Sequence, residues 1–152
     1  MDELDSAIVA ELQRDARQTN RELARRLGVA ASTMLERVRS LTRRGVLHGY
    51  HAEVSLRALN RTVQALVSVQ IRPLHRPVID AFQDFAEGLP EVLSVFCLAG
   101  SDDFVLHVAV QDVERLHGFL IDKLSKRKEV AGFRTSVVYR HARTPGVAVL
   151  PE

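Results

Sequence analysis

The sequence has very little cysteine. Cys97 is the only one, which excludes an intrachain disulfide. It lies in the apolar run VLSVFCLAG, and this setting is typical of a small core residue in a protein kept in a reducing cytoplasm. A reactive thiol is the alternative, and the absence of a neighbouring His or Lys disfavours it.

Long apolar runs are lacking as well. No segment approaches the roughly 18 consecutive apolar residues that a membrane-spanning helix needs. The first residues, MDELDSAIVAELQRD, are acidic and lack the basic region with which a secretory signal begins. We therefore expect a cytoplasmic protein with no membrane partner.

The short motifs of the common enzyme classes are also missing. There is no nucleophile–base pattern, no phosphate-binding loop and no dinucleotide-binding glycine motif. His48 and His51 are three residues apart, but no Cys or carboxylate accompanies them at the spacing of a zinc site. We expect no catalytic residue, no metal, no cofactor and no enzymatic activity.

What the sequence does contain is an uneven distribution of charge. The chain has 152 residues, 46% of them apolar and 26% charged, which is globular composition, and its net charge is only +2. Residues 1–15 carry one arginine against five acidic side chains, residues 16–52 carry eight arginines against two, and residues 53–152 are neutral. Clustered arginine favours a nucleic-acid partner. The alternative is an ordinary solvated charged face.

Three helices are expected in the first 45 residues. Leu4, Ile8 and Leu12 recur at helical spacing. In TNRELARRLG, Thr19 and Glu22 form a capping box and Gly28 is typical of a helix end. In STMLERVRSLTRRG, residues 32–45, we expect Ser32 or Thr33 to cap the third helix and Gly45 to end it. The following VLHGYHAEV is expected to form a strand or a small hairpin.

The third predicted helix carries its apolar and its polar residues on opposite sides. Met34, Leu35 and Leu41 lie within about 60° of Val38 on a helical wheel of about 100° per residue. The opposite side carries hydroxyl and guanidinium groups. Three short helices with such a third helix predict a helix-turn-helix of the winged type, because an α-helix fits the major groove and arginine can pair with guanine. A plain three-helix bundle is the alternative. The predicted DNA-binding residues are Ser32, Thr33, Arg37, Arg39, Arg43 and Arg44.

The second half has a different pattern. Strands and helices follow one another in the order βαββαβ, as in ferredoxin-like domains, so the predicted fold class is α+β. The predicted divisions are a helix-turn-helix domain at 1–52, a linker at 53–61, the βαββαβ domain at 62–142 and a tail at 143–152. For the tail, mobility and packing on a neighbour are both left open.

Two of the predicted strands are apolar on both sides. In VLSVFCLAG, Val92, Phe96 and Leu98 are expected on one face, and Leu93, Val95 and Cys97 on the other. A sheet that is apolar on both faces must be covered on both, and the sequence offers helices for one face only. We infer a homodimer that packs sheet against sheet. The alternative is that these are small apolar residues on a half-solvated face.

The segments ELARRLGV and STMLERVRSLTRRGVLHGY resemble the DNA-binding module of the Lrp/AsnC regulators. The second half resembles the same family's amino-acid-sensing domain, including the turn Gly100-Ser101-Asp102-Asp103-Phe104, which is similar to the family's G-x-x-D-aromatic loop. The resemblance runs from about Leu4 to Tyr139. It implies binding to double-stranded DNA, a dimer often built up into octamers, and an amino-acid effector held between subunits. The effector residues that it implies are Ala99, Gly100, Ser101, Asp103, Phe104, Thr135, Val137 and Val138.

We therefore predict a sequence-specific transcriptional regulator whose DNA binding or assembly responds to a small effector. One rival is an architectural DNA-compacting protein that has little sequence preference and no effector. A second rival is a metabolic enzyme, or its regulatory subunit, whose second half binds an amino acid. The missing catalytic constellation argues against the second rival.

Overall fold

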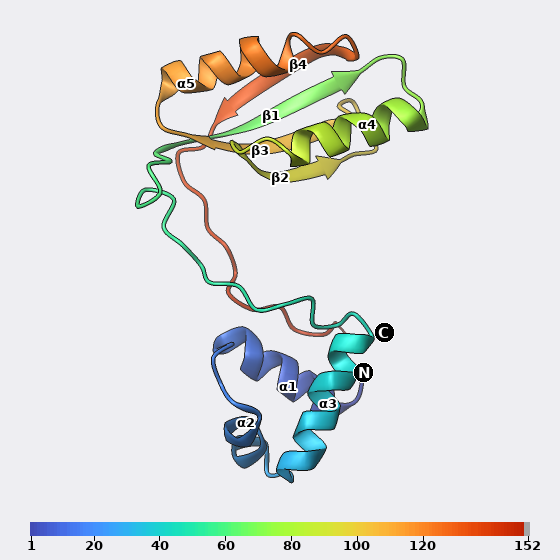
Figure 1. Cartoon of the computed structure of the whole chain (residues 1–152), viewed down its shortest axis with the longest axis vertical. Helices are drawn as coiled ribbons and strands as arrows, with labels where there is room; N and C mark the ends of the chain where they lie inside the picture. Colours follow the sequence, from blue (N-terminus) through green and yellow to red (C-terminus); the bar gives the residue numbers. More distant parts are fainter. Residues whose placement is uncertain (151–152) are drawn as a thin grey trace. The chain divides into compact units, whose positions relative to one another are not determined.

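The computed structural model describes residues 1–150, which form two compact units (Figure 1). The first unit is Met1–Glu53 together with the C-terminal residues from Ala142 on, and the second is Val54–His141. The chain therefore passes between the units twice. The residues of the predicted tail belong to the first unit, and residues 54–61 of the predicted linker belong to the second.

The first unit contains three helices, α1 (Glu3–Arg14), α2 (Asn20–Leu27) and α3 (Ala31–Arg43). Each contributes apolar side chains at helical spacing to one core: Ile8, Leu12, Leu23, Ala24, Met34 and Leu41. The expected capping box of Thr19 and Glu22 is present at the start of α2. Gly28 ends that helix in the left-handed conformation, with φ of 68°, which a glycine adopts without steric cost.

Two local expectations for this unit are wrong. Helix α3 begins at Ala31, two or three residues earlier than a cap at Ser32 or Thr33 would place it. Its N-cap is Ala30, which makes no side-chain capping hydrogen bond. The segment after α3 forms neither the strand nor the hairpin of a wing, because residues 46–53 contain no strand. A strand requires a neighbour for its backbone hydrogen bonds, and these residues find none in the described part of the chain.

The second unit confirms the βαββαβ order. Its elements are β1 (Val63–Ile71), α4 (Arg76–Glu87), β2 (Val92–Cys97), β3 (Phe104–Val110), α5 (Val113–Gly118), the π-helical turn η1 (Phe119–Leu124) and β4 (Val130–Val137). The strands form one antiparallel sheet in the order β2-β3-β1-β4. Helices α4 and α5 cover one face of it (Figure 1), where Phe82 and Leu116 pack with Val67.

The other face of the sheet is open in the single chain. Leu66, Phe96 and Leu98 are each at least 41% exposed. The expected partition of β2 is only partly correct. A bulge between Val92 and Ser94 shifts the register, so Val92 packs with the helix-side core and not with Phe96. Leu93 is 38% exposed and does not join Val95 in that core, and Cys97, expected to be a small core residue, is exposed. Val113 is exposed, since it occupies the first turn of α5. The open face still carries the apolar side chains from which a dimer was predicted.

Candidate DNA interface and effector site

The exposed side of α3 forms the first candidate site. A shallow hollow of about 570 Å³ on this side is lined by Ser32, Thr33, Glu36, Arg37, Ser40 and Arg43. These residues recur at helical spacing on the side opposite Met34 and Leu41, which are fully buried. The structure thus brings four of the six predicted DNA-binding residues onto one surface.

The remaining two predicted DNA-binding arginines lie elsewhere. Arg39 pairs with Glu36 at 3.2 Å between exposed side chains. Arg44 turns back towards the core of the unit, where its Nη2 donates to Asp5 Oδ2 at 2.6 Å. Arg43 has no hydrogen bond or ion pair from its side chain within residues 1–150, so its guanidinium is free to meet a phosphate.

Arg37 is the residue whose setting differs most from the prediction. Its Nη1 donates to Asp2 Oδ2 and, at 3.2 Å, to Asp5 Oδ1. The hydrogen bond to Asp2, followed by that to Asp5, raises the pKa of the Arg37 guanidinium. The backbone N–H of Asp5, together with Arg37, lowers the pKa of the Asp2 carboxyl. Arg37 therefore joins α3 to α1 before any DNA is bound.

Carboxylates on α1 also secure α2. Glu11 pairs with Arg26 of α2 at 3.0 Å and with Arg14 of its own helix at 2.5 Å. Partial burial raises the pKa of the Glu11 carboxyl, but the hydrogen bonds from Arg26 and Arg14 outweigh this and lower it. The signal for these pairs in the sequence is an acid-rich helix that directly precedes two arginine-rich ones.

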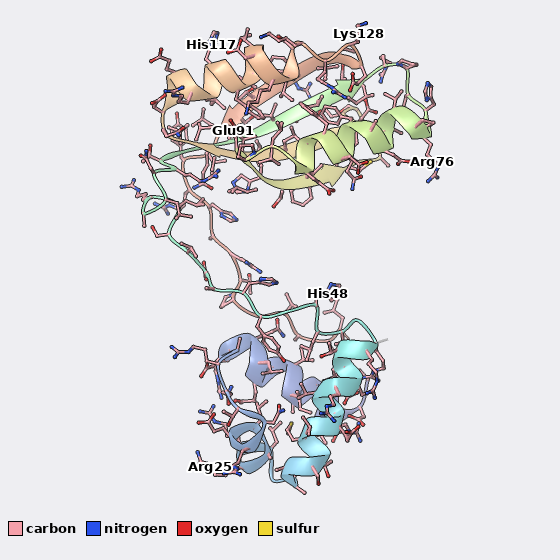
Figure 2. All side chains as sticks on the ribbon, in the orientation of Figure 1. Arg25, His48, Arg76, Glu91, His117 and Lys128 are labelled. Atoms are coloured by element: carbon pink, nitrogen blue, oxygen red, sulfur yellow. The ribbon has the colours of Figure 1, made fainter. Side chains whose placement is uncertain are left out.

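Helix α2 and the turn before it present further positive charge. Arg17, Arg25 and Arg26 border a polar hollow together with Asp15, Gln18 and Glu22. Figure 2 shows Arg25 directed away from the helical core. In a helix-turn-helix, the helix before the recognition helix crosses the DNA backbone, and arginines there contribute affinity without reading sequence.

The second candidate site is the turn between β2 and β3. The backbone N–H of Leu98 donates to the carbonyl of Asp103 at 2.8 Å, which closes the turn. Side chains from the neighbouring strands hold it in place. Gln70 donates to the carbonyl of Ser101 at 3.1 Å, and Arg134 donates to Asp102 Oδ2 at 2.5 Å. Ala99, Gly100 and Ser101 are exposed, and no atom within 4 Å would meet a side chain added at Gly100.

Asp103 and Phe104 are engaged inside the unit. Asp103 Oδ2 accepts from the backbone N–H of Ile71 at 2.7 Å and from Arg72 at 3.2 Å. Phe104 is fully buried, and its ring centroid lies 4.9 Å from that of Phe82. In the single chain these two residues therefore support the turn from beneath, and the exposed surface belongs to its first three residues.

The predicted residues of β4 are not brought to this turn within one chain. The N–H of Val138 donates to the carbonyl of Gln64 at the start of β1, whereas Asp103 contacts Ile71 at the end of that strand. Seven residues of strand correspond to about 23 Å at ~3.3 Å per residue. Thr135 and Val137 are exposed, and Thr135 lies nearest, next to Arg134.

A hollow of about 410 Å³ lies beside Arg72. Pro73, Val78 and Ala81 give it apolar walls, and the cationic Arg127 and Lys128 lie at its border with Glu129. Arg127 pairs with Glu129 at 2.5 Å and stacks over the Phe85 ring at 4.3 Å. Lys128 and Arg76 project at the same end of the unit (Figure 2). Such a lining suits a small molecule that carries both an anionic and an apolar group. Sequence reasoning missed this hollow because it joins residues about 50 positions apart.

The described residues contain neither a metal site nor a helix that could span a membrane. Within residues 1–150, no cluster of His, Cys, Asp and Glu has the arrangement of a metal site. No helix in the same range combines the length and apolar character that crossing a membrane requires.

Comparison with known proteins agrees with this architecture. Residues 1–42 match the AsnC-type helix-turn-helix domain, and residues 64–146 match the Lrp/AsnC ligand binding domain. The chain belongs to the Lrp/AsnC family of sequence-specific helix-turn-helix transcriptional regulators. It is 38% identical to the HTH-type transcriptional regulator AldR of Mycolicibacterium smegmatis over 94% of this chain and 84% of AldR.

Two more similarities place the chain within this family. It is 29% identical to the leucine-responsive regulatory protein of Escherichia coli over 94% of this chain and 87% of that protein. A transcriptional regulator from Neisseria meningitidis, solved as a complex with L-Met, superposes with a TM-score of 0.88 at 29% identity. That match covers 99% of this chain and 96% of the other. These relatives are regulators of transcription and not enzymes, as predicted for this chain.

Proposed function

We propose that this regulator binds its operator through the exposed side of α3 and that a small effector, an amino acid, changes its DNA binding or its assembly. The observation that carries the DNA part is the gathering of Ser32, Thr33 and Arg43 on one exposed helix surface. Hydroxyl groups near the start of the helix reach base edges, and Arg43 near its end neutralises a phosphate.

The six predicted arginine and hydroxyl positions divide into roles. Ser32 and Thr33 read bases, and Arg43 and Arg39 contact phosphates. Arg37 and Arg44 hold α3 in place through Asp5 and add positive charge beside the DNA. We assign no base-reading role to Arg37, because its guanidinium is engaged by Asp2 and Asp5.

The effector part rests on the turn between β2 and β3. Gly100 and Ser101 are exposed and can offer backbone groups to an α-carboxylate. Asp103 Oδ2 is engaged by Ile71 and Arg72, so the Asp103 carboxylate offers its other oxygen, Oδ1, to an α-ammonium group. Because Val137 and Val138 lie far along the sheet from this turn, we propose that a second subunit completes the site. The relative from N. meningitidis was solved with L-Met, which supports an effector of this chemical class.

The proposed assembly is a homodimer through the open sheet face, with octamers as the larger form. Leu66 of β1, Phe96 of β2 and Leu98 just after β2 expose apolar surface on that face. Burying such surface against a second copy is favourable at about 25 cal/mol per Å². As a regulator of chromosomal DNA, the protein is proposed to act in the cytoplasm.

The test is a fluorescence-anisotropy titration of the full chain on DNA from upstream of its own gene, in excess unrelated DNA, with and without each common amino acid. We expect binding that resists the competitor and shifts with one or two amino acids. Binding that the competitor abolishes and that no amino acid shifts would favour an architectural protein.

Substitutions test whether the turn between β2 and β3 is the site that responds to the amino acid. Gly100→Leu fills the open space at the turn and is expected to abolish the amino-acid response while operator binding persists. His117→Leu, an equally exposed change on α5 of the same unit, is the control and is expected to respond as the wild type does. An unaltered response of Gly100→Leu contradicts the proposed site.

A further inference from the structure

The C-terminal segment folds back onto the DNA-binding unit of its own chain. Gln13, in the last turn of α1, donates from Nε2 to the carbonyl of Val147 at 3.0 Å. Its Oε1 accepts from the N–H of Val147 at 2.8 Å. A side-chain amide carries the same donor and acceptor as a peptide group, so it satisfies both backbone groups of Val147 at once.

Further contacts surround this pair. The side chain of Gln13 lies against Gly146, where a Cβ would be 3.8 Å from Gln13 Cβ. Residues 145–148 and the α1 residues Ala10, Gln13 and Arg14 together enclose a hollow of about 400 Å³. Arg143 and Pro145 also border the segment that leaves α3, at Tyr50 and His51. The docked segment, residues 143–148, is called the C-terminal strap below.

The strap follows strand β4 of the other unit along the chain, after a short connecting segment. Strand β4 ends at Val137, and Val147 follows ten residues later. The DNA-binding unit is thus joined to the ligand-binding unit by two stretches of chain, one after α3 and one after β4. An extended chain of ten residues spans at most about 36 Å, so the strap limits how far β4 can move from α1.

Helix α1 connects the strap to the DNA-reading surface. Gln13 lies at its C-terminal end, and Asp2 and Asp5 at its N-terminal end hold Arg37 and Arg44. Glu11 holds Arg26 of α2. A displacement of α1 is therefore passed to both helices of the helix-turn-helix by ion pairs.

We infer that the C-terminal strap is a second, regulatory connection, through which a movement of β4 on effector binding reaches α1 and hence α3. The docking of the strap on α1 stands on the contacts above, while its signalling role rests on the proposed function. Two experiments separate these parts.

The first experiment tests docking without DNA or effector. Cysteines are placed by Gln13→Cys and Gly146→Cys in a Cys97→Ser background. The Cβ separation of 3.8 Å equals the usual value for a disulfide, about 3.8 Å. We expect an intrachain disulfide on mild oxidation, seen as a loss of two mass units and faster migration without reductant.

The matched control pairs Ser6→Cys with Gly146→Cys. Position 6 lies seven residues earlier on α1, about 10 Å away along the helix axis at ~1.5 Å per residue. We expect this pair to cross-link at least tenfold more slowly. Equal rates for the two pairs indicate a free tail, and a disulfide formed only between chains indicates docking on another copy. Either result, or no cross-link at all, overturns the docking of the strap on α1 of its own chain.

The second experiment tests signalling by anisotropy on operator DNA. A chain ending at Ala142 lacks the strap, and a chain ending at Ala148 keeps it. We expect the shorter chain to bind operator within about threefold of wild type but to lose the amino-acid response, and the longer chain to keep that response. A full response from the chain ending at Ala142 overturns the signalling role. If the wild type itself responds to no amino acid, the proposed function fails, and the cross-linking result alone decides the strap.

Discussion

Asp5 and Arg44 form an ion pair at 2.6 Å in which the side chain of Asp5 is only 4% exposed and that of Arg44 is 48% exposed. The same carboxylate accepts from Arg37 at 3.2 Å. One acidic side chain at the start of α1 therefore fixes Arg37 of α3 and Arg44 of its C-terminal cap, two of the six residues predicted to bind DNA. The acidic residues of α1 that pair with these arginines also offset their positive charge. This pairing is one reason why the net charge of the chain is only +2.

Removing this carboxylate is expected to destabilise the first unit. Asp5→Asn keeps the size of the side chain but loses the charge-assisted hydrogen bonds, and we expect the free energy of unfolding to fall by about 1–3 kcal/mol in urea titrations. Glu36→Gln breaks the pair with Arg39, in which both side chains are more than half exposed, and should cost under about 0.5 kcal/mol. Equal losses for the two variants contradict a special role for Asp5.

The arginines of α3 are expected to separate into two kinds. Arg43→Ala should weaken binding to operator and unrelated DNA alike and reduce the salt slope of log K by about 0.9, as the loss of one phosphate contact does. Arg37→Ala should also lower the urea midpoint of unfolding, because it releases Asp2 and Asp5. If Arg37→Ala changes only the preference between bases and leaves the urea midpoint unchanged, Arg37 reads DNA directly.

The stability of the second unit is expected to depend on pH through His107. This imidazole contacts Gln64 Oε1 at 2.9 Å and lies 5.6 Å, ring to ring, from His141. Burial, and then the charge of His141, lowers the pKa of His107 below 6.5. The unfolded chain therefore binds more protons than the folded one between the lowered pKa and 6.5, so stability falls as the pH is lowered through this window.

The check compares variants in urea at fixed protein concentration. The wild type should lose more stability between pH 7.5 and pH 5.5 than His107→Gln. His117→Gln, on the exposed surface of α5, should show the same pH dependence as the wild type. Identical pH dependence in all three proteins would assign the effect to other groups.

The open face of the sheet is expected to form the dimer. Phe96 is 52% exposed there, and Phe96→Asp places a charge where a partner would exclude water. We expect light scattering on a sizing column to show a dimer for the wild type and at least a tenfold weaker dimer for this variant. Val113→Asp, which changes an apolar side chain that is 67% exposed on the helix side, should leave the mass unchanged.

Local sequence signals predicted the elements that local interactions form. Thr19, Glu22 and Gly28 lie within ten positions and define α2 by themselves, because the capping box and the left-handed glycine need no distant partner. The buried side of β1 is likewise readable from alternation, because Ala65, Val67, Val69 and Ile71 occupy every second position and are all buried. The start of α3 was missed because Ala30 offers no capping group, and the packing of Met34 and Leu41 decides where that helix lies.

The sequence predicted which residues form the candidate sites, but it did not predict the contacts that those residues make. The sequence predicted that arginines lie on one face of the third helix. No neighbouring residue in the sequence indicates that Asp2 and Asp5, more than 30 residues earlier, accept hydrogen bonds from Arg37. The bulge that moves Val92 to the helix side also depends on pairing with β3. Alternation along a strand predicts sides only while the register is unbroken.

The sequence by itself determined the architecture: a basic helical unit, a βαββαβ unit, and a surface helix with hydroxyl and guanidinium groups. These follow from periodicity, capping and the distribution of charge, which are properties of neighbouring residues. The tertiary structure alone decided which arginines are free, which are held by Asp5, and where the C-terminal strap lies. Those contacts join residues 32 to 134 positions apart, and only the packed fold brings such residues together.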